Sequence, residues 1–475
     1  PLVPIADITM EETVGYARRL AERVGRELDI PVFLYEAAAT SPRRKNLATI
    51  RAGEYEGLAD KLRDPKWRPD FGPAEHRPRS GATAVGARDF LIAYNVNLNT
   101  TSTRRATAVA WDVREKGRVK REGDQPGGKI VRDAAGEKVW QPGTLRGVKA
   151  IGWYLEEYGI AQVSLNITDL KATPLHTVFE EVAGKARARG MRATGSELVG
   201  LIPLAAMLDA GRYFLAEQQR SLGVSEAEVL HIAVKSLGLD ELAAFDLDRK
   251  IIEYRLRDAA DAPLARMDLR AFADETASES VAPGGGSVAA YLGALGAALG
   301  TMVANLASHK RGWDDRWEEF SGQAEKGQAL KDDLLALVDE DTAAFNRIGA
   351  AMRLPKKSAE EKQARAAAIA DATRGAIEVP LKVMERSLAA MEVIAEMARE
   401  GMASSVSDAG VGALCARAAL RGAWLNVRIN AAAGLDDRGD DRGYVESTLA
   451  KAAEMAEEAE RRETEILAVV AERMG

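Results

Sequence analysis

Residues that build covalent cross-links and metal centres are scarce in this 475-residue chain. Cys415 is the only cysteine, so no intrachain disulfide and no thiolate metal cluster can form. This usage is typical of a reducing compartment, and we therefore expect a cytoplasmic protein. The four histidines lie far apart in sequence, and none has a second histidine at ligand spacing, so we expect no metal site.

Charge of a single sign is also lacking. The chain has 65 Lys and Arg against 72 Asp and Glu, interspersed, and its formal net charge is −7. Proteins that bind nucleic acid or anionic membranes usually carry a basic excess, so we expect neither as a partner. With 46% hydrophobic and 29% charged residues, the composition is that of a soluble globular protein. The length predicts about three domains.

No signal or transit segment is visible at the start of the sequence. The first residue is Pro1 rather than Met, and a strand-like run follows at once. We therefore expect that the chain is truncated at its N-terminus.

Residues 1–240 alternate strand-like runs with helical patterns, which favours an α/β or α+β sandwich with helices on one face of a sheet. The clearest strands are 90–98 and 161–167, and the second alternates strictly between apolar and polar residues. Further elements expected here are helices at 11–28, 53–67 and 175–189, and an exposed loop or hairpin at 114–138.

Polar side chains follow one face of each of these two strands. Asn95 and Asn97 are two residues apart, and so are Gln162, Ser164 and Asn166. Such neutral donors and acceptors could hold an amide- or pteridine-like ligand through several hydrogen bonds. The alternative is an ordinary solvated sheet face, and the pattern alone does not separate the two.

A Pro- and Gly-rich segment at 69–87 predicts a long loop. Loops of this length inside compact domains are usually functional or disordered. The segment combines Arg77 and Arg79 with glycine-containing backbone, a composition suited to binding carboxylates. We expect His76, in the same loop, to be a surface residue.

Helical patterns dominate from residue 267 to the end, after a strand-like run at 251–256 and a polar linker. The run 281–307 begins with a glycine turn and continues as an uncharged helix near the minimum length for a membrane span. Small residues recur on its adjoining turns, so we interpret it as a buried central helix; they are Gly293, Ala297, Gly300 and Ala304. Pro380 should begin or kink a later helix.

Two features of these helices indicate a pocket. The backbone N–H groups of Gly285, Gly286 and Ser287, at the start of the uncharged helix, can bind an anion or the polar edge of a ligand. The lysine that a phosphate-binding Walker loop requires is missing. Asn426 and Asn430 are four residues apart on one face of a mostly apolar helix, where neutral amides need partners.

The stretch 334–356 places an acid among apolar residues. Its apolar positions are spaced as one buried helical stripe: Leu334, Leu337, Val338, Phe345, Ile348 and Met352. Asp341 falls on this stripe, whereas Asp339 is about 200° away around the helix and should face outward. Burial raises the pKa of a carboxyl group, which suits a proton donor near neutral pH. The alternative is structural: Asp341 caps a neighbouring helix or pairs with a buried arginine.

Long blocks of the sequence resemble one family. The blocks PDFGP with the following GAT, ARDFLIAYNVNL, AIGWYLEEYGIAQVSLNITD and LVGLIPLAAMLDA are similar to glutamate formiminotransferase. The blocks VAPGGGSVAA, LVDEDTAAFN, SDAGVGA and LNVRINA are similar to formimidoyltetrahydrofolate cyclodeaminase. Their order matches the fused bifunctional enzyme, and the resemblance covers almost the whole chain.

The resemblance implies a multidomain fold, with α+β formiminotransferase subdomains of the ferredoxin-like type followed by an all-α helical cyclodeaminase domain. The expected limits are 1–85 and 86–240 for the transferase subdomains, 241–266 for a linker and 267–475 for the helical domain. The family's transferase histidine belongs to a His-Pro-Arg motif that would lie upstream of Pro1 and is absent. We therefore expect transfer to be impaired in this chain.

The resemblance also implies a folate-dependent enzyme of histidine degradation, with tetrahydrofolate as substrate and carrier and no metal. One reaction transfers the formimino group from N-formimino-glutamate to tetrahydrofolate. The other closes 5-formimino-tetrahydrofolate to 5,10-methenyltetrahydrofolate and releases ammonia. A homo-oligomer without a membrane span is expected.

The acid of the second reaction maps onto a DxD element of this chain, Asp339 and Asp341, and the inward-facing position selects Asp341. The family's folate-contacting loop maps onto 72–81. Together with the polar features described above, the expected folate-binding residues are Gly72, Pro73, Arg77, Arg79, Gly81, Asn95, Asn97, Gln162, Ser164, Asn166, Gly285, Gly286, Ser287, Asn426 and Asn430.

Two alternatives remain open. The first is a methenyltetrahydrofolate cyclohydrolase, because the helical family also includes that activity, and release of ammonia from formimino-folate would separate the two. The second is a non-catalytic assembly protein built from the helical bundle and its long final helix. A stable oligomer that does not bind tetrahydrofolate would favour it.

Overall fold

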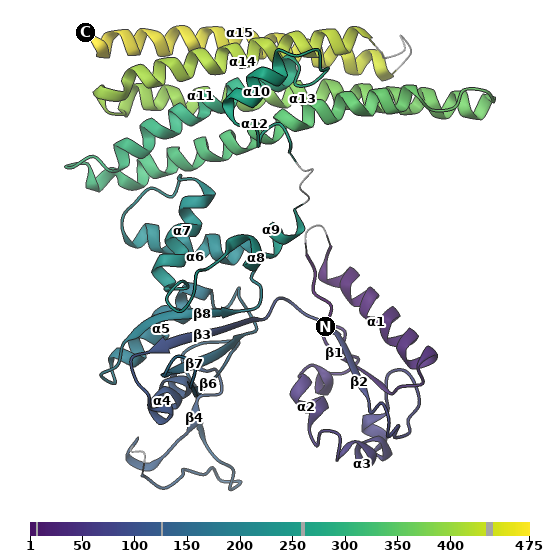
Figure 1. Ribbon diagram of the computed structural model, residues 1–475, viewed down its shortest axis with the longest axis vertical. Helices are drawn as coiled ribbons and strands as arrows, with labels where there is room; N and C mark the ends of the chain where they lie inside the picture. Colours follow the sequence, from purple (N-terminus) through teal and green to yellow (C-terminus); the bar gives the residue numbers. More distant parts are fainter. Residues whose placement is uncertain (6–7, 125–126, 258–261, 434–439) are drawn as a thin grey trace. The chain divides into compact units, whose positions relative to one another are not determined.

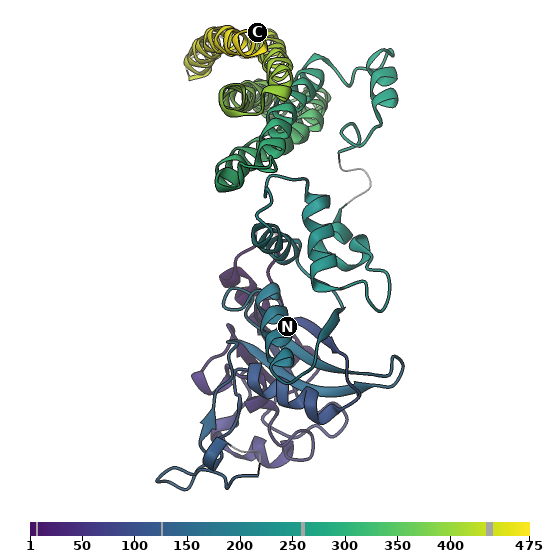
Figure 2. The same cartoon turned by 90° about the vertical axis from the view of Figure 1, so that its left-hand side faces the viewer.

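A computed structural model describes residues 1–5, 8–124, 127–257, 262–433 and 440–475 of the chain. The chain divides into two compact units: unit 1 contains residues 1–206 and 237–252, and unit 2 contains residues 207–236 and 253–475. The described strands all belong to unit 1, and unit 2 is helical (Figures 1 and 2). The domain limits expected from the sequence stay predictions.

A parallel pair of strands forms the first part of unit 1. β1 (Val32–Glu36) pairs with β2 (Thr83–Ala87) along its whole length. α1 (Met10–Glu27) begins with a reciprocal cap, in which the Thr9 hydroxyl accepts from the Glu12 N–H and the Glu12 carboxylate accepts from the Thr9 N–H. The buried side of α1 packs on both strands, so these three elements share one small core.

The connection between β1 and β2 differs from the expectation. Turns occupy residues 52–57, where Gly53 takes a positive φ of 87° that a helix does not allow. The expected helix at 53–67 is therefore wrong over its first part. The expected loop ends at residue 82, because pairing with β1 draws 83–87 into the sheet. The short elements of this connection are α2 (Leu47–Arg51), α3 (Leu58–Arg63) and two 3₁₀ turns, Pro42–Arg44 and Pro65–Trp67.

The second part of unit 1 is a four-stranded antiparallel sheet with strand order β6-β7-β3-β8. In chain order its elements run β-α-β-β-α-β, which is the ferredoxin-like arrangement. The expected ferredoxin-like fold is confirmed for this part. Its elements are β3 (Ile92–Leu98), α4 (Thr103–Val113), β6 (Val148–Leu155), β7 (Ile160–Ile167), α5 (Leu175–Arg187) and β8 (Ala193–Val199), with a small hairpin of β4 (Arg118–Val119) and β5 (Trp140–Gln141) between α4 and β6.

The two faces of this sheet differ as the alternation predicts. Asn97 lies opposite Gln162 across β3 and β7, so their polar side chains share one face. On the other face, Gly152 of β6 lies opposite Val163, and a side chain at residue 152 would overlap the backbone of α4. Helix α4 therefore covers the apolar face of the sheet.

Among the described residues, four helices precede the bundle in unit 2: most of α6 (Leu204–Glu217), most of α7 (Glu226–Leu237), most of α9 (Ile252–Leu256) and α10 (Leu269–Thr276). The expected strand at 251–256 is wrong. Only Ile251 makes a β-type contact, an isolated bridge to Ile202, and no strand ladder continues from it. The rest of the run forms α9 (Ile252–Leu256), after the short α8 (Leu247–Lys250) of unit 1.

In the described part of unit 2, five long helices build the bundle, as expected from the periodicity. Within it, α11 packs against α12, α13 and α14, and α15 packs against α13 and α14 (Figure 1). The expected close approach is present: a Cβ at Gly293 would lie 2.7 Å from Ser387 Oγ, and one at Gly300 would lie 2.9 Å from Ile394. The helices are α11 (Gly285–Ser308), α12 (Trp317–Met352), α13 (Ala359–Glu400), α14 (Val406–Ala433) and α15 (Asp440–Met474).

Helix α11 has the composition of a membrane span but the position of a core helix. Among the described residues it alone is long and apolar enough to cross a bilayer, and 61% of its most apolar stretch is buried inside the protein. Burial by three neighbouring helices accounts for the apolar composition.

A helix start at Pro380 is wrong, because α13 runs through it and Pro380 is buried in the helix interior, whereas a kink there stays a prediction. Proline has no N–H, so the carbonyl four residues earlier, that of Ala376, loses its helical donor. Asn430 of α14 supplies the missing donor: its Nδ2 lies 2.7 Å from the Ala376 carbonyl oxygen. Packing of α14 on α13 thus makes an interior proline acceptable.

This contact predicts a coupling between two helices. Asn430→Ala leaves the Ala376 carbonyl without a donor and should lower the free energy of unfolding by about 1–3 kcal/mol. In a Pro380→Ala background, residue 380 regains its N–H, so the same Asn430→Ala change should have a much smaller effect. A double-mutant cycle of urea unfolding, followed by circular dichroism, measures the difference. Equal losses in both backgrounds would contradict this explanation.

Candidate functional site

Asp341 lies on the side of α12 that faces α11. Four residues before it, Leu337 is buried, and three residues after it, Ala344 is buried, so the carboxylate starts from an apolar surface. The side chain of Asp341 is half-buried, and its Oδ2 accepts a hydrogen bond of 3.2 Å from the Ser287 hydroxyl. Thr342 Oγ1 lies 3.3 Å from the same hydroxyl. The expectation that Asp341 faces inward agrees with this geometry.

The first turn of α11 leaves room for this carboxylate because it lacks side chains. A Cβ at Gly286 would overlap the carboxyl group of Asp341. A Cβ at Gly285 would lie 3.7 Å from Asn426 Nδ2 of α14. Three separate predictions, the glycine turn, the acid and one of the two asparagines, therefore meet at the start of α11.

The environment of Asp341 suits proton transfer. Burial raises the pKa of the Asp341 carboxyl above its ordinary value, and hydrogen bonds from the Ser287 side chain and backbone oppose that shift. The carboxyl is thus more readily protonated near neutral pH than an exposed aspartate, and its partners favour the anion left after it gives up the proton. These are the properties of a general acid.

The other acid of the DxD element has a different role. Asp339 was expected to face outward, and that expectation is wrong. Its Oδ1 accepts from the Leu264 N–H at 2.8 Å, and its Oδ2 accepts from the Ala265 N–H at 3.0 Å. Both oxygens are occupied by backbone of the segment before α10, so Asp339 fixes that segment on α12.

The apolar stripe of α12 is shorter than expected. Leu334, Leu337 and Val338 are buried, but Phe345 and Met352 are each 55% exposed. The expected stripe is therefore wrong at Phe345 and Met352, whereas Ile348 is half-buried and packs against the bundle core. Two large apolar side chains remain on its surface.

The two asparagines of α14 separate in role. Asn426 lies beside Gly285 at the start of α11. Its Nδ2 donates to the Gly422 carbonyl at 2.9 Å, so this bond does not use its amide oxygen. Asn430 donates to the Ala376 carbonyl. Asn426 thus lies at the start of α11, whereas the amide of Asn430 has a structural partner, and a pocket lined by both stays a prediction.

On the sheet face of unit 1, the central polar residues bond to one another. Trp153 Nε1 donates to Gln162 Oε1 at 2.9 Å, Gln162 Nε2 to Asn97 Oδ1 at 2.7 Å, and Asn97 Nδ2 to Glu241 Oε2 at 2.6 Å. Asn97 and Gln162 have no exposed surface. Direct contact of these two amides with a ligand stays a prediction. It would require some of these side-chain hydrogen bonds to break.

A carboxylate completes this polar face and was missed from the sequence. Glu197 Oε2 accepts from Asn95 Nδ2 at 3.1 Å and from Gln162 Nε2 at 3.3 Å, and the side chain is half-buried. Glu197 lies opposite Asn95 across β3 and β8, so the alternation of β8 was the available signal. Ser164 is half-buried and Asn166 is exposed, further along the face.

The loop expected to contact folate is bounded by two glycines in a left-handed conformation. Gly72 has a φ of 77° and Gly81 a φ of 63°, which other residues adopt only with strain. A side chain at Gly72 would also overlap the carbonyl of Ile30. Pro73 follows, half-exposed. The loop therefore has fixed ends.

The cations of this loop are not equivalent. Arg77 Nη2 lies 2.7 Å from Asp29 Oδ2, and Arg77 Nη1 lies 3.1 Å from Glu75 Oε2. Arg77 is therefore paired inside the chain rather than free for a ligand carboxylate. Arg79 is exposed.

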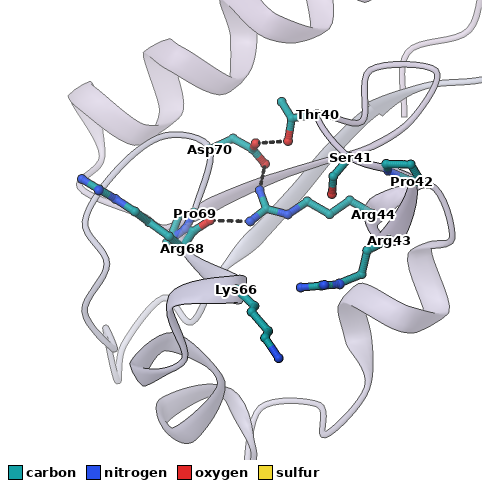
Figure 3. A pocket seen from close by; sticks show the side chains of 9 residues that line it. All are labelled: Thr40, Ser41, Pro42, Arg43, Arg44, Lys66, Arg68, Pro69 and Asp70. Atoms are coloured by element: carbon teal, nitrogen blue, oxygen red, sulfur yellow. Dashed lines mark hydrogen bonds and ion pairs between the residues drawn. The ribbon is translucent and has the colours of Figure 1, made fainter.

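A cavity that was missed from the sequence lies directly before this loop. Its volume is about 600 Å³, and its walls come from residues 40–44, Lys66 and residues 68–70 (Figure 3). Inside it, Arg44 Nη1 and Asp70 Oδ2 form a buried ion pair of 2.6 Å. The basic run PRRK at 42–45 was the sequence signal for this cavity.

Among the described residues no group of three or more His, Cys, Asp or Glu side chains could hold a metal ion. The chemistry available at Asp341 is that of a carboxylic acid, a hydroxyl and an amide. The absence of a metal site stays an expectation.

Comparison with known proteins places the whole chain beside one group of enzymes. Residues 1–88 match the formiminotransferase domain, N-terminal subdomain, residues 93–257 the formiminotransferase domain, and residues 268–461 the formiminotransferase-cyclodeaminase model. Formimidoyltransferase-cyclodeaminase of Mus musculus is 40% identical over 442 residues, which are 93% of this chain and 77% of the mouse protein.

Single-activity proteins resemble parts of the chain. Glutamate formimidoyltransferase of Streptococcus pyogenes serotype M1 is 40% identical over 215 residues, 45% of this chain and 64% of that protein. Methenyltetrahydrofolate cyclohydrolase of Methylorubrum extorquens is 41% identical over 173 residues, 36% of this chain and 81% of that protein.

The two carboxylates of α12 should respond in opposite ways to loss of their charge. Asp339→Asn removes a charged acceptor from two backbone N–H groups and should lower the free energy of unfolding by about 1–3 kcal/mol. Asp341 has a raised pKa, so its folded state holds the proton more tightly than its unfolded state. Its contribution to stability is present below the unfolded-state pKa and is lost as pH rises through the folded-state pKa.

Asp341→Asn should therefore be at least as stable as wild type near neutral pH and closer to wild type under acid conditions. Urea unfolding of wild type and both variants at the two pH values measures this. A loss in Asp341→Asn as large as that in Asp339→Asn would show that both carboxylates are structural.

Proposed function

The chain belongs to the formimidoyltransferase-cyclodeaminase family, and we propose that Asp341 is the general acid of its cyclodeaminase reaction. The chain is a bifunctional, folate-dependent enzyme of histidine degradation. Its transferase part moves a formimino group from N-formimino-glutamate to tetrahydrofolate. Its helical part closes 5-formimino-tetrahydrofolate to 5,10-methenyltetrahydrofolate and releases ammonia.

Ring closure needs one proton at one atom. N10 of the folate attacks the formimino carbon on N5 and forms a tetrahedral centre that carries an amino group. The C–N bond to that amino group breaks only if the nitrogen leaves as ammonia, so it must first be protonated. The product is a methenyl bridge with a delocalised positive charge.

Asp341 can serve both needs. In its protonated form it donates to the leaving nitrogen, and the carboxylate that remains stabilises the cationic bridge. The raised pKa favours the protonated form before the step, and the Ser287 hydroxyl, 3.2 Å from Oδ2, stabilises the anion after it. The observation that carries this proposal is the position of Asp341 at the glycine-lined start of α11.

The neighbours of Asp341 would bind the folate ring system. Gly285 and Gly286 leave backbone uncovered at the helix start, and Asn426 brings a neutral amide beside Gly285. Neutral donors and acceptors of this kind suit the polar edge of a pteridine. Asp339 supports the site from behind by fixing residues 264 and 265 on α12.

In the transferase part, folate would contact the loop 72–81 and the polar sheet face. Gly72 and Gly81 fix the two ends of that loop. On the sheet, Asn95 and Gln162 both donate to one oxygen of Glu197, which leaves the other oxygen available for a ligand donor. The role of the remaining amides is to position this carboxylate.

Association of several copies of the chain is part of the proposal. Phe345 and Met352 of α12 are each 55% exposed, and Leu425 and Ile429 of α14 are 56% and 65% exposed. Large apolar side chains on helix surfaces favour burial against another subunit. A cytoplasmic homo-oligomer, with α11 as a core helix rather than a membrane span, accounts for these surfaces and for the single cysteine.

The acid can be tested by one conservative change. Asp341→Asn should fold normally and form 5,10-methenyltetrahydrofolate at least a hundredfold more slowly, because general acids contribute about 10²–10⁴-fold to such steps. The assay starts from 5-formimino-tetrahydrofolate, and the methenyl product is followed by its near-ultraviolet absorbance. Glu340→Gln is the matched control, since Glu340 is adjacent on the helix and pairs with Lys382. Wild-type turnover by Asp341→Asn would remove it from the mechanism.

The same assay separates the cyclohydrolase alternative, which the similarity to the Methylorubrum protein raises. A cyclodeaminase releases one ammonia for each methenyl product formed. A chain that consumes methenyltetrahydrofolate but releases no ammonia from 5-formimino-tetrahydrofolate would favour the cyclohydrolase.

A further inference from the structure

Ser287, in the first turn of α11, contacts two neighbouring side chains of α12. Its hydroxyl oxygen lies 3.2 Å from Asp341 Oδ2 and 3.3 Å from Thr342 Oγ1. Ser287 has no exposed surface, whereas Thr342 is half-buried. Because Ser287 is enclosed, its hydroxyl does not reach a substrate directly and acts on the reaction only through Asp341.

The number of available hydrogens decides the direction of both contacts. A serine hydroxyl carries one hydrogen and accepts further hydrogen bonds on its oxygen. An ionised carboxylate only accepts, so the Ser287 hydrogen points to Asp341 Oδ2 whenever Asp341 is charged. The contact between Ser287 and Thr342 is then a hydrogen bond only if Thr342 donates. The hydroxyl chain therefore runs from Thr342 to Ser287 to Oδ2.

This hydroxyl chain makes the two oxygens of Asp341 unequal. Among the described side chains, that of Ser287 alone donates to this carboxyl group, and it does so at Oδ2. An oxygen that accepts a hydrogen bond is suited to be the carbonyl oxygen of the protonated acid, which leaves the proton for Oδ1. A Ser287 hydroxyl without the bond from Thr342 is free to turn and accept the proton of Asp341 instead.

We propose that Thr342 and Ser287 are positioning residues that keep the acidic proton of Asp341 on Oδ1. On Oδ1 the proton is available to the leaving nitrogen, whereas a proton on Oδ2 is held by Ser287. In the step itself the Oδ1–H bond breaks, an N–H bond forms on the amino group, and the electron pair stays on the carboxylate. The inference rests on the role proposed for Asp341 and adds the atom from which the proton leaves.

No neighbouring charge does the same work. The causes of the pKa shift of Asp341 are burial and the hydrogen bonds of Ser287, and no charged side chain is among them. Around this site, titratable side chains of α11, α13, α14 and the segment before α10 contact other groups: Tyr291 with Phe272, Lys382 with Glu340, Arg421 and Arg428 with Trp424, and Asp339 with the N–H groups of Leu264 and Ala265.

The test is the pH profile of cyclisation of 5-formimino-tetrahydrofolate by the full chain. Thr342→Val removes the hydroxyl but keeps the branched shape, and it should lower kcat about fivefold or more while KM stays within about twofold. Ser287→Ala should also lower kcat. Because it removes a hydrogen bond that favours the anion, it should move the high-pH limb of kcat to higher pH.

Two further variants are controls. Thr342→Ser keeps the hydroxyl and should retain the kcat and the pH profile of wild type. Thr464→Val removes a hydroxyl of the same kind on α15, where it donates to the Glu460 carbonyl, and should also behave as wild type does. Circular dichroism confirms that each variant folds.

The two hydroxyls act in series, so their effects should not add. In a Ser287→Ala background, Thr342→Val should lower kcat little further. An equal effect of Thr342→Val in both backgrounds, or wild-type kcat and pH profile in Ser287→Ala and Thr342→Val, would overturn the proposal. If Asp341→Asn is inactive, such a result refutes only the positioning by the hydroxyl chain. Full turnover by Asp341→Asn would instead refute the proposed function itself.

Discussion

The small residues along α11 are the constraint on which unit 2 depends. Gly293 and Gly300 let α13 approach until Ser387 and Ile394 touch the α11 backbone, and such contacts leave no space for even a methyl group. The same property at Gly286 admits a carboxylate instead of an apolar side chain. The feature that packs the bundle therefore also creates a position where Asp341 is sheltered from water and adjacent to backbone N–H groups.

Residue type alone does not decide what an acid does here. Asp339 and Asp341 are two positions apart on one helix, and the direction of each side chain determines its partners. Asp339 reaches two backbone N–H groups and becomes a structural anchor. Asp341 reaches a hydroxyl at a sheltered helix start, where burial raises its pKa. Two aspartates within one helical turn therefore have different roles: Asp339 is structural, and Asp341 is the proposed acid.

Local pattern predicted the elements whose partners are local or periodic. The helix expected at 11–28, the alternation of β7 and the inward position of Asp341 follow from spacing alone. The errors arose where a distant segment decides the outcome. Phe345 fits a buried stripe, but whether it is buried depends on a neighbour that spacing does not reveal.

At Pro380, too, a distant segment decides the structure, but here it makes an unfavourable residue acceptable. Proline in a helix is unfavourable because one carbonyl loses its donor, and a local rule therefore places a helix start or a kink there. The donor comes from Asn430, fifty positions later on another helix. Glu197 was missed for a similar reason, since its significance lies in facing Asn95 across two strands.

Internal compensation distinguishes polar groups that serve the fold from those that remain available to a ligand. Asn430 and Arg77 looked like ligand contacts in the sequence, yet each has its partner inside the chain. Arg43 and Lys66 were not predicted to bind a ligand, yet the described structure leaves their charges without a carboxylate beside a cavity. A polar group is costly to bury unpaired, so folding satisfies the groups it encloses. Exposed groups such as Arg43 and Lys66 are solvated by water instead, so they stay accessible to a partner from outside the chain.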